Sequence, residues 1–459
     1  MIIDVPQTKE VLLFLIVTKK NMTITSFSQN LKINSKDLVE TIHSTAATFG
    51  AKGVWGSEPT QTGVCRLALS DIDKQVKDWF VSETKKLGCT IKIDEVGNIF
   101  ATYPGKYNDH KPTGIGSHLD TQPTGGRYDG IYGVLSGLQV LRTLHANKIT
   151  PNFPITVINW CNEEGARFPM SLMASSVWAG IKTKDEVYAL KDVYDNETTV
   201  LEELKRIGYL GDVECSYKTN PLDCHFEIHI EQGPVLEKYG KPVGVLTGAQ
   251  AYNWLIVKMK GMSQHTGTTP MEFRRDALLA TSKVITGVNQ IAKKYGGLAS
   301  IAHMTVSPDV VNVIAGEVEF VLDIRHETDE GLTKIRKDCI ELIERASLNE
   351  DGNGVRLPYT IEDPYPIKAT HFDEMLINIV DESATVIVGD EGKHKMVSGA
   401  GHDSCATNLV VPTVMIFVPS VDGVSHNPRE HTKPEELEIG FRVLLESILR
   451  YDNARLSDL

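Results

Sequence analysis

The chain has 459 residues, of which 41% are hydrophobic and 23% charged, and its formal net charge is −13 at pH 7. This composition is typical of a globular protein with a substantial core and two or three domains. Because phosphate contacts need a basic face, the acidic balance argues against nucleic acid as a main partner. The seven cysteines are scattered and form no Cys-x-x-Cys pair, which indicates a reducing compartment and gives no support to a thiolate zinc site.

The N-terminal segment contains one apolar run, residues 11–17, which is too short to span a membrane. Asp4 and Glu10 precede this run and no small-residue cleavage pattern follows it, so a secretory signal is not indicated. Together with the cysteine pattern, this predicts a cytoplasmic protein with no membrane partner. Residues 1–40 are expected to be an N-terminal extension of the first domain.

The first half of the chain alternates between helical and strand patterns. Such alternation predicts an α/β domain with a mostly parallel sheet, in which ligands bind at the carboxyl ends of the strands. The predicted elements in chain order are helical segments within 38–86, strands at 89–94 and 98–103, a strand-like run at 113–117, a helix at 133–144 and a buried strand at 155–160.

Between residues 250 and 366 the element order changes to β-α-β-β-α-β, which is the ferredoxin-like pattern. Because helix and strand patterns resume after this module, we expect it to be inserted in a discontinuous host domain. We therefore predict residues 1–249 and 367–459 as the two parts of the host and 250–366 as the inserted domain. The strands of the module are expected at 252–259, 300–306, 310–325 and 355–361, and its helices at 275–295 and 329–346.

The most informative motif places a histidine and two carboxylates around a glycine-rich turn. His118 and Asp120 follow the strand-like run, and Asp129 lies in Gly-Gly-Arg-Tyr-Asp-Gly at 125–130. Imidazole and carboxylate are ligands of zinc and its first-row neighbours, and glycine lets the backbone approach an ion closely. This motif predicts a metal site at the end of the strand. Asp120 is suited to accept the other N–H of the His118 ring, with a turn or helix cap as its alternative role.

A second acidic motif, Glu163-Glu164, follows the predicted strand at 155–160. Adjacent residues on a regular backbone point in different directions, so one carboxylate can bind metal while the other faces the attacking water. We assign Glu164 to the metal and Glu163 to general acid–base catalysis, in which it takes a proton from water and passes it to the leaving nitrogen. A solvated acidic turn is the alternative, because Gly165 follows the pair.

Two more of the 14 histidines are candidate ligands. His229 lies in an alternating strand pattern, and His426 lies in a turn-rich loop after the apolar strand at 414–418. Taken singly, each would be an ordinary polar residue. Together with the acidic motifs they provide three imidazoles and two carboxylates, which exceed the needs of one catalytic zinc and so favour two metal ions. If Asp129 bridges the two ions, a shared hydroxide has room between them.

These motifs, taken in order, resemble the amidase/hydantoinase branch of the dinuclear-zinc metallopeptidases of the aminoacylase/carboxypeptidase type. Within that branch the chain most resembles fungal β-alanine synthase (β-ureidopropionase), with N-carbamoyl-L-amino-acid hydrolase and allantoate amidohydrolase as relatives. The resemblance covers residues 44–453. It rests on Ser-His-Leu-Asp at 117–120 with Gly-Gly-x-x-Asp-Gly at 125–130, on Asn-Glu-Glu-Gly-Ala-Arg-Phe at 162–168, and on His-Ile-Glu-Gln-Gly-Pro at 229–234.

The resemblance implies a catalytic domain with a mixed sheet sandwiched by helices, and a smaller lid domain that closes over the site and mediates homodimerisation. It also implies two zinc ions per subunit, with another divalent ion such as Mn²⁺ as the alternative. Glu163 would be the acid–base group and Asp129 would bridge the ions. The implied ligands are His118, Asp129, Glu164, His229 and His426.

The resemblance further implies which groups hold the substrate. His265, in a loop after the first strand of the inserted domain, would stabilise the tetrahedral oxyanion, although the Ser-Gln before it departs from the usual small-residue pattern. Arg325 would bind the substrate carboxylate through its planar fork, with Asn312 assisting. Gln232 and His402 are further candidate contacts. His265, Asn312 and Arg325 are the residues through which one subunit could complete the site of another.

The favoured function is metal-dependent hydrolysis of N-carbamoyl amino acids, a small-molecule class of ureido acids. The first choice is N-carbamyl-β-alanine, which would give β-alanine, carbon dioxide and ammonia in pyrimidine breakdown. Hydrolysis of allantoate or of an N-carbamoyl-L-α-amino acid is the alternative, and the motif order disfavours a peptidase. A non-catalytic metal-binding protein on the same scaffold is less favoured, because none of the expected ligand or acid–base residues is missing.

Overall fold

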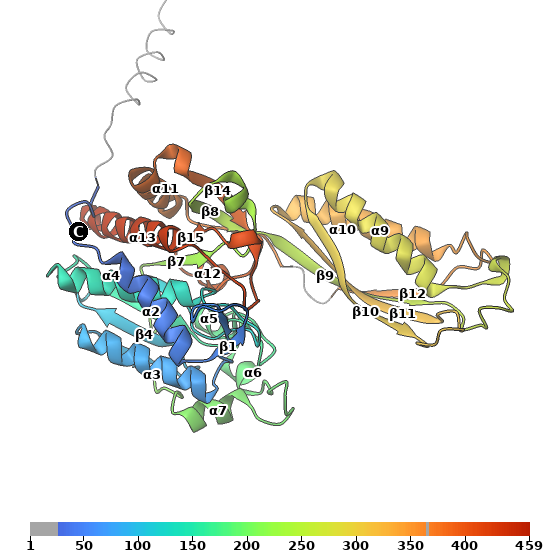
Figure 1. The fold of residues 1–459 in the computed structure, drawn as a ribbon, viewed down its shortest axis with the longest axis horizontal. Coiled ribbons are helices and arrows are strands. Elements are labelled where there is room, and N and C mark those ends of the chain that lie inside the picture. The colour runs from blue at the N-terminus through green and yellow to red at the C-terminus, as the bar shows by residue number, and fades with distance from the viewer. Residues whose placement is uncertain (1–25, 364–366) are drawn as a thin grey trace, which may run out of the picture. The chain divides into compact units, whose positions relative to one another are not determined.

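The structure is a computed structural model that describes residues 26–363 and 367–459 (Figure 1). The apolar run near the N-terminus, and with it the first part of the expected extension, lies outside the described residues. The described residues divide into two compact units. Unit 1 comprises the described residues up to 245 with 374–394 and 416–459, and unit 2 comprises the described residues of 246–373 with 395–415.

The larger sheet is mixed. Its strands in chain order are β3 Thr90–Ile93, β4 Ile99–Tyr103, β5 Thr113–His118, β6 Ile155–Trp160, β7 Cys224–Ile230, β8 Val243–Ala249, β13 Thr370–His371, β14 Lys393–Ser398 and β15 Thr413–Val418. The strand order of this sheet is β13-β8-β15-β7-β5-β6-β4-β3, and β14 also pairs with β8. β5 is parallel to β6 and β7, whereas β3, β4 and β15 form antiparallel pairs. Every residue of β5, β6 and β7 is buried.

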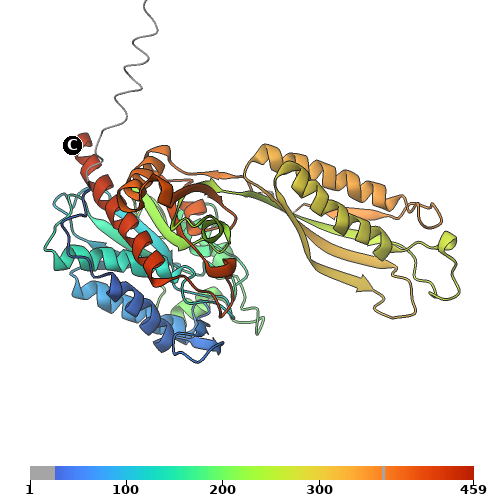
Figure 2. The same cartoon turned by 45° about the horizontal axis from the view of Figure 1, so that its top comes forward.

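Helices flank this sheet. In chain order those of unit 1 are α2 Ser35–Thr48, α3 Asp71–Lys86, α4 Ile131–Ala146, α5 Met173–Trp178, α6 Lys184–Tyr188, α7 Val200–Ile207, α8 Val235–Tyr239, α11 Glu374–Val388 and α13 Pro434–Ala454. α4 and α13 both contact β7, and α2 contacts both of these helices (Figures 1 and 2). α3 contacts β3 and β4. A separate antiparallel pair joins β1 Ala51–Val54 and β2 Thr62–Val64. The α/β fold with a helix-flanked mixed sheet, which the resemblance implies, is confirmed. The mostly parallel sheet predicted from the alternation of elements is wrong, because β3, β4, β8 and β15 form antiparallel pairs.

Helix α4 lies close to the strands that carry the candidate ligands, because two glycines face them. A Cβ atom at Gly133 would lie 2.6 Å from the carbonyl oxygen of Ile228, and one at Gly137 would lie 2.8 Å from Val157 Cγ1. Most of the helix is buried, as expected for a helix that is apolar on nearly all sides. Since α4 begins directly after Gly130, this packing fixes the turn in which Asp129 lies.

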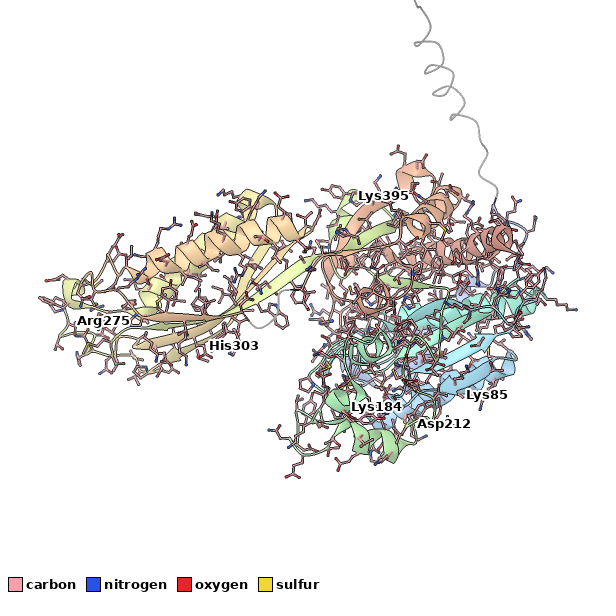
Figure 3. All side chains as sticks on the ribbon, turned by 180° about the vertical axis from the view of Figure 1, so that it is seen from behind. Lys85, Lys184, Asp212, Arg275, His303 and Lys395 are labelled. Carbon is pink, nitrogen blue, oxygen red and sulfur yellow. The ribbon has the colours of Figure 1, made fainter. Side chains whose placement is uncertain are left out.

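Unit 2 contains an antiparallel sheet with two helices packed on it. The elements run β9 Ala251–Lys260, α9 Ala277–Tyr295, β10 Leu298–Ser307, β11 Glu317–His326, α10 Asp329–Ser347 and β12 Tyr359–Glu362, and the sheet order is β10-β11-β9-β12. This is the expected β-α-β-β-α-β order. Alternate residues of β9 and β11, such as Leu255 and Phe320, form a core with Val284 of α9 and Ile335 of α10. Figure 3 shows the side chains, with His303 on β10.

Two segments differ from the sequence-based expectation. The strand expected at 310–325 begins only at Glu317, because the N–H of Val313 donates back to the carbonyl of Val310 and forms a turn. Residues 395–415, which contain α12 Asp403–Thr407, group with unit 2 instead of the host domain. Backbone bonds such as Gln250 N to Ser398 O, 2.9 Å, hold this segment. Contacts between segments so far apart in the chain leave no local sequence pattern.

The remaining short elements and the cysteines add little to the site. All seven cysteines are free thiols. No helix in the part of the chain that the structure describes is long and apolar enough to cross a membrane. Single turns of 3-10 helix occur at Met271–Phe273, Asp390–Gly392, Val421–Gly423 and Arg455–Asp458.

Candidate metal centre

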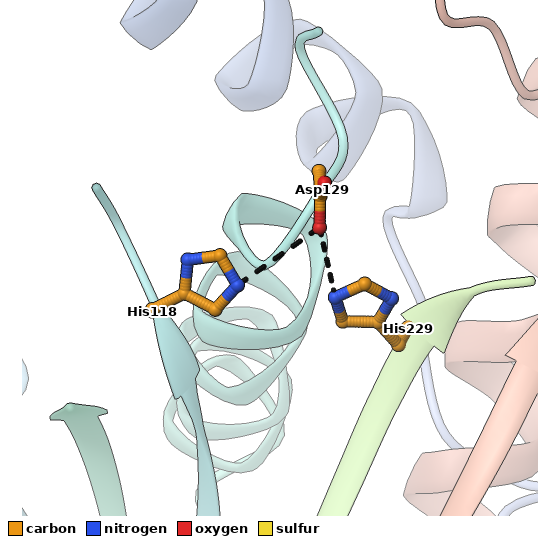
Figure 4. A group of neighbouring side chains, drawn as sticks. All are labelled: His118, Asp129 and His229. Atoms are coloured by element: carbon orange, nitrogen blue, oxygen red, sulfur yellow. Dashed lines mark ion pairs between the residues drawn. The ribbon is translucent and has the colours of Figure 1, made fainter. Parts of the chain in front are cut away.

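The ends of two neighbouring parallel strands and the turn before α4 bring three predicted ligands together. His118 is the last residue of β5, His229 lies near the end of β7, and Asp129 precedes α4. Asp129 Oδ1 lies 3.1 Å from His229 Nε2 and 3.9 Å from His118 Nε2 (Figure 4). All three residues are buried. We call them the inner group, and their donor atoms lie within 4.8 Å of one another, close enough to hold one metal ion.

Backbone carbonyls orient both imidazoles of the inner group. His118 Nδ1 bonds to the carbonyl of Asp120 at 2.9 Å, and His229 Nδ1 bonds to the carbonyl of Ile230 at 2.8 Å. In the tautomers that these bonds favour, each Nδ1 carries the proton and each Nε2 is an acceptor, as a metal ligand must be. Gly130 has φ +67°, and a Cβ there would lie 2.2 Å from the His118 ring, so only glycine fits. The Gly130 N–H also donates to His229 Nε2 at 3.1 Å.

Asp120 orients His118 through its backbone, and its carboxylate has a different role. The two carboxylate oxygens accept the backbone N–H groups of Glu163, at 3.4 Å, and of Glu164, at 3.3 Å. Burial, with the charge of Asp73 added, raises the pKa of Asp120 to about 7. The two-residue spacing from His118 pointed to the correct residue, but it does not distinguish a carbonyl from a carboxylate. Asp120 therefore ties the end of β5 to the second acidic motif.

A second group of donors lies on the other side of the same aspartate. Asp129 Oδ2 is 3.2 Å from His426 Nε2, which is 3.4 Å from Glu164 Oε2. Gln122 holds Glu164, since its Nε2 donates to Oε2 at 2.8 Å. The His426 side chain is 50% exposed, in contrast to the 1% of His229. We call Asp129, Glu164 and His426 the outer group. The two groups contact different oxygens of Asp129, Oδ1 on the inner side and Oδ2 on the outer side.

Glu163 lies on the inner side of the centre. Its Oε2 is 3.4 Å from His118 Nε2, and its side chain is largely buried. The adjacent carboxylates therefore diverge, with Glu163 toward the inner group and Glu164 toward the outer group. Asn162, which links them to β6, has φ +55°, so the chain leaves the strand in a conformation that turns the acidic pair. The acidic pair is not the solvated turn that was the alternative interpretation.

The protonation of the centre follows from the arrangement of its charges. Burial lowers the pKa of His118 to about 4. Burial alone would lower that of His229, but its contact with Asp129 raises it to about 9, and a hydrogen bond to Asp129 raises that of His426 to about 9. Burial and the charge of Asp129 raise the pKa of Glu164 to about 8. Bonds from both histidines hold the pKa of Asp129 well below its usual value, against the effect of burial. Metal ions that bind at neutral pH would therefore displace protons.

Three polar residues surround Asp129, and only one was expected. Gln232, predicted to bind substrate, donates from Nε2 to Asp129 Oδ2 at 2.9 Å and to Ser425 Oγ at 3.2 Å. Ser425 Oγ donates to Glu430 Oε2 at 2.8 Å, and Glu430 Oε1 accepts the N–H of Tyr128 at 3.0 Å and of Asp129 at 3.1 Å. Ser425 and Glu430 were not predicted. Their nearness in the chain to His426 is the one signal that could have identified them.

Two predicted substrate-binding residues lie next to each other at one end of the unit 2 sheet. The loops of His265 and Asn312 pair through a backbone bridge from His265 to Val313 and through the bond from Thr266 N to Asn312 O, 3.0 Å. Both side chains are exposed. His265 Nδ1 accepts the N–H of Gly267 at 3.1 Å, which leaves its Nε2 for an external partner.

Arg325 already has partners in unit 2. Its Nε and Nη2 donate to Asp323, at 3.1 Å and 2.8 Å, and its Nη1 donates to the carbonyl of Gly399 at 2.8 Å. A guanidinium has five N–H donors, so one N–H on each terminal nitrogen is left for a carboxylate. His402 is buried and its Nε2 lies 3.0 Å from Ser398 Oγ.

Asn312 and Arg325 are not brought together within one chain. Arg325 pairs with Tyr252 at the start of β9, whereas Asn312 precedes Glu317, which pairs with Lys260 at the end of β9. The eight residue-to-residue steps from Tyr252 to Lys260 correspond to roughly 27 Å in an antiparallel strand. The two residues therefore lie at opposite ends of the sheet, and one small molecule cannot contact both in the same chain.

Comparison with protein families and with curated relatives places the chain among hydrolases. A family model described as "Peptidase family M20/M25/M40" matches residues 114–450. N-carbamoyl-L-amino-acid amidohydrolase of Rhizobium meliloti is 36% identical over 427 residues, which cover 92% of this chain and 97% of that protein. Allantoate amidohydrolase of Bacillus subtilis is 32% identical over 375 residues, which cover 80% of this chain and 88% of that protein.

A solved structure shares the fold over nearly the whole chain. An amidase of the hydantoinase/carbamoylase family from Burkholderia multivorans superposes with a TM-score of 0.83 and is 41% identical, covering 92% of this chain and 98% of that one. The helix-flanked mixed sheet described above is therefore the fold of that amidase as well.

Proposed function

The chain belongs to peptidase family M20/M25/M40, and on this premise we propose that it is a metal-dependent amidohydrolase of ureido acids. The observation that carries the proposal is the pair of donor groups that share Asp129, with the carboxylate of Glu163 beside them. Relatives named as amidohydrolases of N-carbamoyl-L-amino acids and of allantoate support the choice of a carbon–nitrogen bond next to a carbonyl.

The donor set fits two divalent ions, and we propose Zn²⁺ with Mn²⁺ as the alternative. His118, Asp129 and His229 would hold one ion, and Asp129, Glu164 and His426 the other. Imidazole nitrogen and carboxylate oxygen are suitable ligands for both metals, and the set contains no thiolate. Such ions supply Lewis acidity, which activates water and polarises a carbonyl at neutral pH.

Glu163 is proposed as the general base and then the general acid. Its carboxylate faces His118 and is largely buried, so it is shielded from bulk water but next to the donor groups. It would accept the proton of the attacking water and deliver it to the nitrogen that leaves as the carbon–nitrogen bond breaks. Asp120 holds the backbone N–H groups of Glu163 and Glu164, so it would orient the acid–base group and a ligand together.

The finer substrate assignment is a choice within one chemical class. We propose N-carbamyl-β-alanine as the first substrate, which yields β-alanine, carbon dioxide and ammonia, because the motifs most resemble β-alanine synthase. N-carbamoyl-L-α-amino acids are the second candidate, favoured by the 36% identity to the Rhizobium protein. Arg325, with its two free N–H groups, would bind the carboxylate that these substrates share.

The unit 2 residues support a proposed homodimer. His265 and Asn312 lie at the opposite end of the sheet from Arg325, so a ureido acid could contact all three only if they come from two chains. We therefore propose that His265 and Asn312 of one subunit complete the site of its partner. Mixing Glu163→Gln chains with His265→Ala chains tests this. Activity that returns in the mixed dimer, although each variant alone is inactive, supports the proposal, and no recovery contradicts it.

A substrate panel tests the proposed function. Metal-loaded protein would be assayed against N-carbamyl-β-alanine, N-carbamoyl-L-α-amino acids, allantoate and dipeptides, with release of ammonia and of the free amine as readouts. We expect turnover of at least one ureido acid, with N-carbamyl-β-alanine preferred, and no turnover of dipeptides. Cleavage of dipeptides without turnover of any ureido acid would contradict the proposal.

A further inference from the structure

Glu430 is a fully buried acidic residue close to the metal centre that the proposed reaction does not use. It lies four residues after His426, and it is 2% exposed. Its Oε1 accepts two consecutive backbone N–H groups, those of Tyr128 and Asp129, and its Oε2 accepts the hydroxyl of Ser425 at 2.8 Å. One carboxylate therefore holds both the turn that carries Asp129 and the turn that carries His426.

The fit between these two turns is tight. A Cβ atom at Gly126 would lie 2.1 Å from Glu430 Oε1 and 2.2 Å from its Cδ, so the glycine-rich turn rests directly on the carboxylate. Ser425 Oγ also lies 3.3 Å from Asp129 Oδ2. A second tie runs beside the first, since the Tyr128 hydroxyl is 3.3 Å from His431 Nδ1.

The outer group depends on such contacts between loops more than the inner group does. His118 and His229 are held by buried strands, whereas the side chain of His426 is half exposed and its backbone has φ +53°. Neither burial nor strand pairing holds His426 in place. The bonds of Ser425 and Glu430, together with those of Gln232, connect its turn to Asp129, the residue that both groups share.

We propose that Glu430 is a positioning residue that fastens the Ser425–His426 turn to the Asp129 turn, so that the outer metal position forms in register with the inner one. This inference rests on the proposed function, in which the two groups each hold an ion. It predicts that loss of the Glu430 carboxylate weakens the outer ion selectively. Loss of a group that orients a ligand costs about 10- to 100-fold in metal affinity.

The chain offers a closely matched control for this test. Glu446, on α13, is also fully buried, and its carboxylate accepts the N–H groups of Phe27 and Ser28, at 2.9 Å and 2.8 Å, together with the hydroxyl of Ser28. Glu430→Ala and Glu446→Ala therefore both remove a buried carboxylate that is bonded to two consecutive amides and a serine hydroxyl, although Glu446 also pairs with Arg450 at 3.2 Å. Only the first of these is next to the candidate metal centre.

Calorimetric titration of the metal-free full chain with Zn²⁺ measures the effect directly. We expect two equivalents to bind to the wild type and to Glu446→Ala. In Glu430→Ala one equivalent should bind as in the wild type, and the other about 10- to 100-fold more weakly. Glu430→Gln keeps an oxygen that can accept both N–H groups and should retain more of the outer affinity. Unchanged affinities for both ions in Glu430→Ala would overturn the inference while leaving the proposed function intact.

A milder variant decides the matter if Glu430→Ala does not fold. Ser425→Ala removes only the hydroxyl that joins Glu430 to the His426 turn, and should weaken the outer ion without affecting the inner one. Equal affinities in Ser425→Ala and the wild type would overturn the inference in that case. A wild-type chain that binds fewer than two equivalents would instead contradict the proposed pair of ions, and the inference would fail with it.

Discussion

The inner and outer groups share Asp129 but are held in place by different parts of the fold. The inner histidines lie on buried, directly paired strands, and backbone carbonyls orient their rings. The outer group relies on loops, in which Gln122 holds Glu164 and the Ser425–Glu430 pair holds the His426 turn. The strands of the sheet thus position the histidines of the inner group. The outer group depends on specific side-chain contacts between loops.

This difference predicts that the geometry of the inner donor atoms changes little, whereas that of the outer donor atoms can change when the loops move. Burial keeps the inner donors away from water, so their geometry is set when the sheet forms. The His426 side chain is half exposed and lies on a loop, so it can move when its turn moves. If the two supports are independent, a change on one side should leave the metal affinity of the other side unaffected.

The largest expected effect is the loss of turnover when Glu163 is replaced. This residue lies on the inner side of the centre but is not a predicted metal ligand. Glu163→Gln keeps the shape of the side chain but removes the proton acceptor, so kcat should fall by about 10²- to 10⁴-fold. Because Glu163 lies outside both donor groups, metal content measured by atomic spectroscopy should not change. Undiminished turnover in this variant would remove Glu163 from the mechanism and favour a non-catalytic metal-binding protein.

A pair of histidine variants tests the asymmetry of the centre. His426→Ala should weaken only the outer ion. His229→Ala should weaken the inner ion more than the outer one, because it removes a ligand of the inner group alone. Each loss should exceed the roughly 10- to 100-fold that an outer-shell change costs, as measured by Zn²⁺ titration. If His426→Ala weakened both ions equally, the two sides would not be separate.

The pH dependence of the metal-free protein should reveal the protons that ions replace. The pKa values of His229 and His426 are raised from 6.5 to about 9 in the folded chain. The stability that these shifts provide is fully present below pH 6.5 and is lost as pH rises toward 9. Melting temperatures of the metal-free protein should therefore fall across this window, whereas those of the metal-loaded protein should fall less. A flat profile for the metal-free chain would contradict the assigned protonation.

The smallest expected effect comes from Gln122. Its amide donates to Glu164 at 2.8 Å, but the backbone N–H of Gln122 also donates to Glu164, at 3.2 Å, and this bond remains in an alanine variant. Gln122→Ala should weaken the outer ion by about threefold to tenfold, and the inner ion serves as the internal control. A change in the affinity of the inner ion would show that the two sides are coupled more strongly than their contacts indicate.

Much of this centre could be predicted from the sequence because its ligands are chemically distinctive residues at the ends of recognisable strands. His118, Asp129 and Glu164 each follow a strand-like run or a glycine-rich turn, and parallel strands bring such ends together. The order of elements in unit 2 was likewise predictable, since period-two and helical patterns are local. The likeness to known hydrolases then provided the roles that residue types alone do not specify.

What the sequence could not provide are contacts between distant loops. In the sequence Glu430 resembles any other acidic residue, and only the fold shows that Gly126 packs against its carboxylate. Whether the carbonyl or the carboxylate of Asp120 bonds to the His118 ring depends on the conformation of the turn between them. The grouping of residues 395–415 with unit 2 rests on bonds to segments more than a hundred residues away. Asn312 and Arg325 were expected to act together, and only the strand register of β9 and β11 shows that they lie at opposite ends.

Anomalous X-ray scattering from crystals of the Zn²⁺-loaded protein would locate the bound ions themselves. Two peaks are predicted per chain, one between His118, His229 and Asp129 Oδ1 and one between Glu164, His426 and Asp129 Oδ2, so that the carboxylate of Asp129 lies between them. Loss of only the outer peak in crystals of Ser425→Ala or Glu430→Ala would agree with the different supports of the two groups. An absence of peaks at both groups in fully loaded crystals, or peaks away from Asp129, would contradict the account.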